Sequence, residues 1–268
     1  MTKTETTVVL GGNGKTGRRV AERLRALGRP VRAVSRSSET PFDWSDAATW
    51  GPALEGADSL YITYYPDLAV PGAADHVRAV TELATRKGTR RLVLLAGRGE
   101  PQVHPAEEAV RSAGVDFTIL ECSFFAQNFS EGVLTPMDGV VAFPGGAVRE
   151  PFIDCNDIAD VAVAALTDPR HAGKTYELTG PEAITFESAV AAMSDVVGPL
   201  RYVPVSFEDY AGMLEGQLPP AQIEFFVELF RFLLDGHNAH ATDGVEQAIG
   251  RPATSFADWA KRALGGAR

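Results

Sequence analysis

Short apolar runs alternate with longer amphipathic segments along the first half of the chain. Each run is rich in β-branched residues and bounded by polar or turn-forming ones, which is typical of buried strands. The runs cover residues 6–10, 31–35, 59–64, 91–96 and 117–121. Helical spacing of apolar residues predicts helices over 73–86 and 105–112. Strands that alternate with helices predict an α/β fold built on a doubly wound parallel sheet.

A glycine-rich turn directly follows the first of these runs. Gly11, Gly12, Gly14 and Gly17 fit both G-x-G-x-x-G and G-x-x-G-x-x-G, and Val20 then opens an amphipathic helix. Glycines let the backbone turn sharply and approach a pyrophosphate, and the helix N-terminus attracts its charge. A P-loop would need a glycine where the chain has Val9, so that motif is excluded. The turn therefore predicts a Rossmann-type dinucleotide site.

The end of the second predicted strand indicates which dinucleotide binds. An NAD site places a carboxylate about twenty residues after the glycines. Here Ser35, Arg36, Ser37 and Ser38 come first, and no acid precedes Glu39. An arginine at this point suits the 2′-phosphate of NADP(H), although a solvated surface arginine is the alternative. We therefore expect NADP as the cofactor, with Arg36 as the 2′-phosphate contact.

In the first half of the chain, residues 42–44 also predict a short strand and residues 46–54 a helix. The second half follows a different pattern, because from about Leu134 the regular alternation of strands and helices is lost. Residues 139–146 predict a hairpin, and Asn156 and Asp157 are candidate caps of a helix. Further helices are expected near 186–197, 207–217, 220–234 and 255–264, with a short strand at 201–205. We expect an NAD(P)-binding Rossmann core at 1–154 and a smaller, mostly helical substrate-side part at 155–268, with 174–179 returning to the sheet.

The composition of the chain limits its expected partners and cellular compartment. A formal net charge of −10 argues against nucleic acid as a partner, and no apolar stretch is long enough to span a bilayer. Cys122 and Cys155 have no metal-ligand spacing, and the polar N-terminus has no signal-peptide pattern, so a reduced, cytoplasmic setting is expected. A monomer and a homodimer both stay open.

Taken together, these motifs resemble the NmrA-like family of atypical short-chain dehydrogenases/reductases, the group that includes type 2 NAD(P)H:quinone oxidoreductases. The likeness spans nearly the whole chain. It is carried by residues 11–17, 35–36, 42–44, 107–114, 117–120, 123–129, 151–154, 157–159, 176–181 and 250–259.

The resemblance implies positions for the cofactor. Arg36 would bind the 2′-phosphate, and Asp43 and Trp44 would lie near the adenine. The glycine turn would hold the pyrophosphate through Gly11, Gly12, Asn13, Gly14, Lys15, Thr16 and Gly17. The ribose and nicotinamide would be flanked by Thr63, Tyr64, Gly97 and Ser123. The family often has a serine and an arginine where this chain has Gly97 and Glu121, which leaves the contacts there open.

The proton donor of ordinary short-chain dehydrogenases is absent. Their Tyr-x-x-x-Lys pair lowers the tyrosine pKa, but none of the six tyrosines has a lysine four residues later. Tyr64, Tyr65 and His104 are weak catalytic candidates, with structural or capping roles as the alternative. Hydride can still move to an acceptor that is already activated, such as a quinone, an enone or an iminium ion.

Aromatic residues expected to form a C-terminal cap predict a small apolar or aromatic substrate. Its expected contacts are Phe124, Phe125, Asn128, Phe152 and Phe226. The hypothesis we favour is that the protein is an NADPH-dependent reductase of a quinone, enone or imine. Two others stay open: a non-catalytic NADP(H)-sensing regulator, and a nonredox isomerase, dehydratase or cyclase on the same fold.

Overall fold

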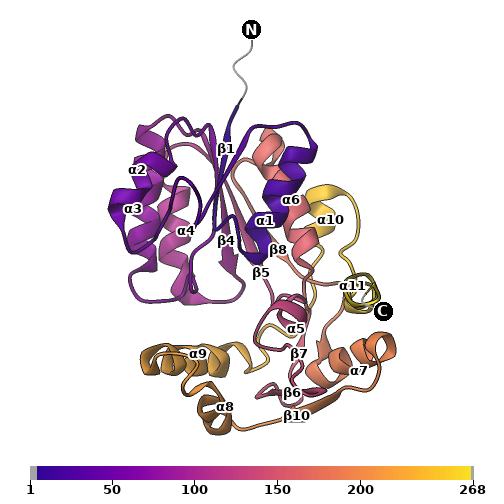
Figure 1. Ribbon diagram of the computed structural model, residues 1–268. Helices are drawn as coiled ribbons and strands as arrows, with labels where there is room; N and C mark the ends of the chain where they lie inside the picture. Colours follow the sequence, from indigo (N-terminus) through magenta and orange to yellow (C-terminus); the bar gives the residue numbers. More distant parts are fainter. Residues whose placement is uncertain (1–4, 267–268) are drawn as a thin grey trace. The chain divides into compact units, whose positions relative to one another are not determined.

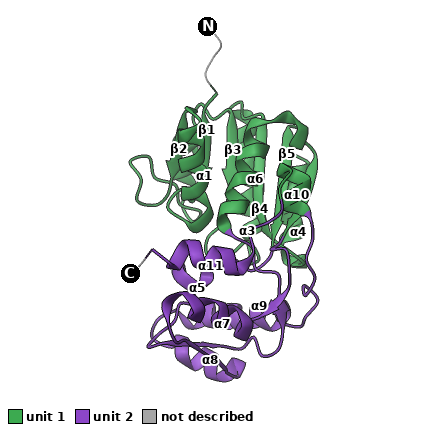
Figure 2. Cartoon of the chain, turned by 90° about the vertical axis from the view of Figure 1, so that its right-hand side faces the viewer, with its two compact units in different colours: residues 1–122, 155–178, 244–251 green, residues 123–154, 179–243, 252–268 purple. Residues whose placement is uncertain are grey.

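The structure is a computed structural model and describes residues 5–266. The chain divides into two compact units, shown in different colours in Figure 2. Unit 1 holds the residues up to 122 together with 155–178 and 244–251, and unit 2 holds 123–154, 179–243 and the residues from 252 on. The chain thus passes between the units several times, whereas the sequence predicts a core at 1–154 and a second part at 155–268 from which only 174–179 returns.

Unit 1 is built on a six-stranded sheet. Its strands are β1 (Thr7–Leu10), β2 (Val31–Val34), β3 (Ser59–Ile62), β4 (Arg91–Gly97), β5 (Asp116–Cys122) and β8 (Lys174–Leu178). They lie in the order β2-β1-β3-β4-β5-β8, and every neighbouring pair is parallel. The doubly wound parallel sheet is confirmed. The expected return of 174–179 is seen in β8, where Tyr176 pairs with Leu120 of β5.

Helices cover both faces of this sheet (Figure 1). One face carries α1 (Lys15–Ala26), α6 (Cys155–Thr167) and α10 (Gly244–Ile249), and the other carries α2 (Trp50–Ala53), α3 (Ala73–Arg86) and α4 (His104–Arg111). Because both faces of the sheet are covered, the central strands β1 and β3 are buried at every position. Short 3₁₀ helices lie at Ala47–Thr49, Pro101–Val103 and Pro169–His171.

Two local predictions in unit 1 are wrong. Residues 42–44 do not join the sheet: Asp43 forms a single bridge with Asp46, while Phe42 and Trp44 are buried. Helix α6 begins at Cys155, so Asp157 lies within its first turn instead of capping it. The carboxylate of Asp157 is buried and accepts a hydrogen bond from Arg251 at 2.7 Å. Both predictions used local pattern alone, and tertiary packing decided the outcome.

Unit 2 contains two small sheets and several helices. Strand β6 (Val140–Phe143) pairs in parallel with β10 (Arg201–Pro204), and β7 (Arg149–Glu150) pairs antiparallel with β9 (Ile184–Thr185). The predicted hairpin at 139–146 is therefore wrong, because β6 finds its partner about sixty residues later in the sequence. The helices are α5 (Asn128–Glu131), α7 (Phe186–Val197), α8 (Phe207–Leu214), α9 (Pro220–Leu233) and α11 (Phe256–Leu264).

An aromatic cluster forms the core of unit 2. The rings of Phe129 and Phe152 meet edge to face at 5.3 Å, and Phe152 meets Phe186 in the same way at 5.2 Å. Such edge contacts are the favoured geometry of aromatic pairs. Trp259 of α11 is completely buried beside them. Burial of large rings supplies this unit with much of its hydrophobic stabilisation.

Candidate functional site

The glycine turn links β1 to α1 and shows why particular positions are glycine. Gly11 has a φ of 66°, a conformation that favours glycine. A Cβ on Gly12 would lie 2.7 Å from the Cβ of Ala33 in β2, and one on Gly17 would overlap the carbonyl of Gly11. Gly14 differs, because a Cβ there would meet only the Gly11 carbonyl oxygen, at 3.1 Å. Gly11 is therefore required by its backbone conformation and Gly12 and Gly17 by packing, whereas Gly14 has the most open approach.

Side chains connect this turn with the neighbouring turn after β2. The amide of Asn13 donates to the Oγ atoms of Ser35 and Ser37 at 2.9 and 3.2 Å. On the other side, the hydroxyl of Thr63 donates to the carbonyl of Leu10 at 3.3 Å. The ends of β1, β2 and β3 are thus held together by polar contacts. Asn13 and Thr63, both expected at the cofactor site, support its shape.

Arg36 follows β2 and is exposed. Its guanidinium lies 4.9 Å from the ring centre of Tyr65, a cation–π contact. Hydrogen bonds from Ser45 hold the pKa of the Asp43 carboxyl below its usual range, and the charge of Arg36 lowers that pKa further. The cation of Arg36 therefore lies at the carboxyl edge of the sheet. Tyr65, a weak catalytic candidate, contacts this guanidinium with its ring.

Trp44 and Tyr64 belong to an aromatic group beside the end of β3. Their rings lie 4.6 Å apart, and the indole of Trp44 donates to the carbonyl of Thr63 at 3.1 Å. The hydroxyl of Tyr64 is hydrogen-bonded to Nδ1 of His76 at 2.6 Å, and burial raises the Tyr64 pKa. A raised pKa is the opposite of what a Tyr-x-x-x-Lys pair achieves. The third weak candidate, His104, is exposed at the start of α4.

A carboxyl group that is not among the predicted site residues occupies the space above Gly97. Glu100 follows β4, and its side chain is only 7% exposed. A Cβ on Gly97 would overlap Oε1 of Glu100, so the missing side chain at 97 makes room for this carboxyl. Burial, and then the nearby charge of Asp67, raise the pKa of Glu100 to about 8. The only sequence signal was the absence of the side chain usual in the family at Gly97.

Glu121 also has a raised pKa, but in a different setting. It lies within β5, where burial, together with Glu107 and Glu177, raises its pKa to about 7 against the opposing charges of Arg111 and Arg98. Arg111 pairs with Glu107 at 3.0 Å, and Arg98 pairs with Glu177 at 2.8 Å. Glu121 is therefore part of a charged network that joins β5, β8 and α4.

The residues expected to bind substrate all lie in unit 2, with different degrees of burial. Phe152 is buried in the aromatic core, and Phe124 is half-buried against Phe143 at 6.2 Å. Phe125, Asn128 and Phe226 are half-buried. Ser123, expected near the nicotinamide, donates its hydroxyl to the carbonyl of Pro151 at 2.6 Å.

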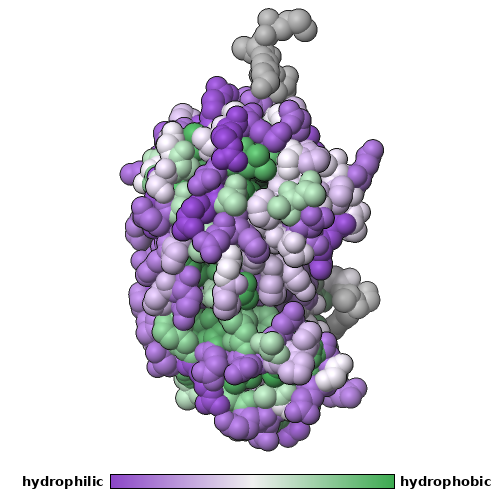
Figure 3. Space-filling model, turned by 90° about the vertical axis from the view of Figure 1, so that its left-hand side faces the viewer, coloured by the Kyte–Doolittle hydropathy of each residue, from purple (hydrophilic) through white to green (hydrophobic). Residues whose placement is uncertain are grey.

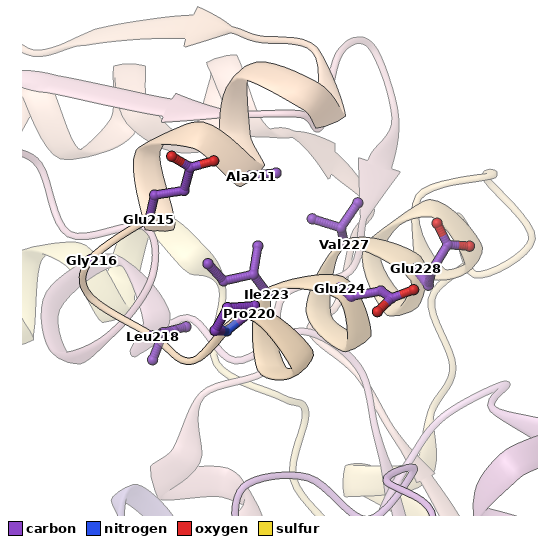
Figure 4. Close-up of a pocket in the computed structure, with 9 residues that line it drawn as sticks. All are labelled: Ala211, Glu215, Gly216, Leu218, Pro220, Ile223, Glu224, Val227 and Glu228. Atoms are coloured by element: carbon purple, nitrogen blue, oxygen red, sulfur yellow. The ribbon is translucent and has the colours of Figure 1, made fainter.

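Unit 2 also has a cavity of about 650 Å³ between α8 and α9 (Figure 4). Ala211, Ile223 and Val227 point into it, whereas Glu215 and Glu224 lie at its edge. Apolar side chains gather on the surface that carries these helices (Figure 3). Apolar walls with a few carboxylates at the rim suit a small apolar molecule, especially one with positive charge. The predicted substrate residues are not among those that line it.

Within residues 5–266, no helix is both long and apolar enough to cross a membrane.

The chain is similar to several reductases. It is 32% identical to the (4-alkanoyl-5-oxo-2,5-dihydrofuran-3-yl)methyl phosphate reductase of Streptomyces griseus, over 94% of this chain and 95% of the relative. It is 28% identical to the NAD(P)H azoreductase of Xenophilus azovorans, over 95% of this chain and 96% of the relative. The fold matches an NADPH complex of the quinone oxidoreductase QOR2 of Escherichia coli, with a TM-score of 0.77 and 21% identity over 96% and 99% of the two chains. No family model matches the chain.

Proposed function

The chain belongs to the NmrA-like family of atypical short-chain dehydrogenases/reductases, and on this premise we propose that it is an NADPH-dependent reductase of a small activated acceptor, such as a quinone, an enone or an imine. The observation that carries the proposal is the edge of the sheet formed by the glycine turn and Arg36. This edge offers a place for a pyrophosphate and, beside it, a cation for a further phosphate.

The residues of unit 1 fit a dinucleotide. A Cβ on Gly14, the N-cap of α1, would meet only the carbonyl oxygen of Gly11 within 4 Å, which leaves room for a phosphate to approach the backbone there. The first turn of α1 contains no acidic residue that would repel it. Gly11 to Gly17 would hold the pyrophosphate, and Trp44 and Asp43 would lie on the adenine side. When bound, the cofactor supplies a hydride.

The choice of NADPH over NADH rests on Arg36. A guanidinium forms charge-assisted hydrogen bonds with a phosphate, and the contact with Tyr65 holds it at the edge of the sheet. Asn13 keeps the turn after β2 close to the glycine turn through Ser35 and Ser37. The azoreductase and the QOR2 structure are named for NAD(P)H and NADPH, which supports this assignment.

The proposal of an activated acceptor rests on the hydrogen bonds of the tyrosines. Tyr64 is engaged with His76, and no tyrosine has the lysine partner that would make it a strong proton donor. An electron-poor double bond needs less protonation during hydride transfer than a simple ketone does. The similar reductases are named for a 5-oxo-2,5-dihydrofuran and, as an azoreductase, for an azo group. Both names describe conjugated acceptors.

The test is NADPH oxidation by the purified protein with a quinone, an enone, an iminium ion and an alkyl ketone, each repeated with NADH. We expect turnover with the conjugated acceptors, little with the alkyl ketone, and a preference for NADPH. Efficient reduction of the alkyl ketone would contradict the acceptor class. Tight NADP(H) binding without turnover of any acceptor would identify a sensor instead of a reductase.

A further inference from the structure

Glu100 is an acidic side chain in an unusual position. It lies in the loop that connects β4 to α4, and only 7% of it is exposed to solvent. Its carboxyl rests against Gly97, the last residue of β4. A Cβ at 97 would overlap the flexible end of this side chain, so glycine leaves room for the carboxyl at the end of the strand.

The carboxyl of Glu100 has no hydrogen-bond partner within residues 5–266. The charged group that acts on it is Asp67, in the loop after β3, whose own carboxylate accepts from the amide of Ala69 at 2.8 Å. Arg98, two residues before Glu100, pairs with Glu177 at 2.8 Å. The carboxyl oxygens of Glu100 are not among the fully buried polar atoms of residues 5–266 that lack a hydrogen-bond partner. They therefore reach solvent at the strand end, where a ligand can approach them.

The order of strands relates Glu100 to the proposed cofactor. A dinucleotide binds across the carboxyl edge of such a sheet, where the strand order reverses. Here the reversal lies at β1, with β2 on one side and β3 and β4 on the other. If Arg36, after β2, binds the 2′-phosphate of the adenosine half, the other half is directed towards β3 and β4. Asp67 and Glu100 follow these two strands.

We propose that Glu100 is the proton donor of the reduction, delivering its proton to the oxygen or nitrogen of the acceptor, and that Asp67 is a positioning residue that keeps Glu100 protonated. This inference rests on the proposed function. It assigns a role to a residue outside the weak candidates Tyr64, Tyr65 and His104.

The step balances as a two-electron reduction. Bound NADPH supplies a hydride, which forms a new bond at the electron-poor atom of the acceptor. The O–H bond of Glu100 breaks, and its proton joins the acceptor oxygen or nitrogen, which receives the displaced electron pair. Glu100 is left as a carboxylate and regains a proton from solvent. The acceptor is reduced, and NADPH is oxidised to NADP⁺.

Burial and the charge of Asp67 raise the pKa of Glu100 to about 8, so the carboxyl is protonated at neutral pH. A positive charge placed beside it would lower that pKa and release the proton. The nicotinamide ring carries a positive charge in NADP⁺ and none in NADPH. Binding of the two cofactor forms therefore differs in proton release if Glu100 lies beside the ring.

Calorimetry in two buffers with different ionisation enthalpies measures this release directly, close to neutral pH. We expect NADP⁺ to release more protons than NADPH on binding to the unchanged protein, and Glu100→Gln to abolish the difference. Glu121→Gln is the matched control, because Glu121 also has a raised pKa but belongs to the charged network of Glu107 and Glu177. An equal release with both cofactor forms, or a difference that persists in Glu100→Gln, would overturn the proposal.

Kinetics with an enone gives a second readout. We expect Glu100→Gln to lower kcat at least tenfold with little change in NADPH binding, and Glu100→Asp to restore part of it. Asp67→Asn should shift the alkaline limb of kcat to lower pH. Unchanged kcat and pH profile in these variants would overturn the role of Glu100 while leaving the reductase intact. If the unchanged protein does not bind NADPH, that result would instead contradict the proposed function.

Discussion

The carboxyl ends of β1 and β2 differ sharply from those of β3 and β4. The first pair of strand ends carries the glycine turn and an exposed cation, Arg36. The second pair is followed by the acids Asp67 and Glu100, whose pKa values are raised chiefly by burial. In the proposed reductase, the first side would bind the cofactor through shape and permanent charge, whereas on the second side burial keeps Glu100 protonated at neutral pH. The comparison teaches that one sheet edge can combine a permanent charge with a proton held by burial.

The glycine turn gives the largest expected effect. Gly14→Val should reduce NADPH affinity at least a hundredfold, because the β-branched side chain would cover the backbone at the start of α1. The φ and ψ of Gly14, −76° and 172°, are open to any residue, so the fold should survive. Cofactor titration with a thermal melt checks both points. Gly51→Val is the control, since a Cβ at Gly51 meets nothing within 4 Å; retained affinity in folded Gly14→Val would make the turn purely structural.

Glu100 should make stability depend on pH. Its folded-state pKa of about 8 lies above the ordinary value of 4.5, so the folded protein binds this proton more tightly than the unfolded chain. The resulting stabilisation is present below the ordinary value and is lost as pH rises through the folded one. Between about pH 5 and about pH 9 we expect a loss on the order of several kcal/mol from this group.

Denaturant unfolding at a series of pH values measures that loss. Glu100→Gln should show a shallower decline of the unfolding free energy than the unchanged protein, and Glu108→Gln, exposed on α4, should not. Parallel pH dependences for Glu100→Gln and the unchanged protein would show that Glu100 titrates normally.

Arg36 should give a smaller and selective effect. Arg36→Ala should weaken NADPH binding by about 1.5–3 kcal/mol, typical of a charged hydrogen bond, and leave NADH binding nearly unchanged. Arg25→Ala removes an exposed charge at the far end of α1 and serves as the control. Equal affinities of the unchanged protein for NADH and NADPH would contradict a 2′-phosphate contact.

The cavity of unit 2 should give the smallest effect. Glu215 and Glu224 are exposed at its rim, so replacing both with Gln should weaken binding of a cationic aromatic dye by at most about 1 kcal/mol. Fluorescence titration with the dye and a neutral analogue measures this. Glu187→Gln, on α7, should change neither. A loss that is equal for the neutral dye would exclude a charge effect.

Much of unit 1 could be predicted from the sequence. Its strands are short apolar runs that keep their pattern in isolation, so the ranges expected for β4, β5 and α3 agree with the structure to within one residue. The failures involve distant partners. Residues 139–146 resembled a hairpin because the sequence does not reveal that β6 pairs with β10.

The candidate site, like the fold, has one part that could be predicted from the sequence and one that could not. The glycine turn and Arg36 are adjacent in sequence to the strands that position them, so motif spacing was enough to predict where they lie in the fold, and their role in cofactor binding stays a prediction. Glu100 was missed because its burial depends on Gly97 and its pKa on Asp67, more than thirty residues earlier in another loop. A carboxyl in a loop looks like a solvated surface charge until the fold places it. Such protonation states arise from tertiary structure alone.

Deuterium transfer tests the central claim most directly. NADPH carrying deuterium at both C4 positions of the nicotinamide would be incubated with the protein and a cyclic enone, and the product examined by mass spectrometry and NMR. The account predicts deuterium on the former β-carbon of the enone, with the second hydrogen derived from solvent. A product without deuterium, or tightly bound cofactor with no product for any conjugated acceptor, would contradict it.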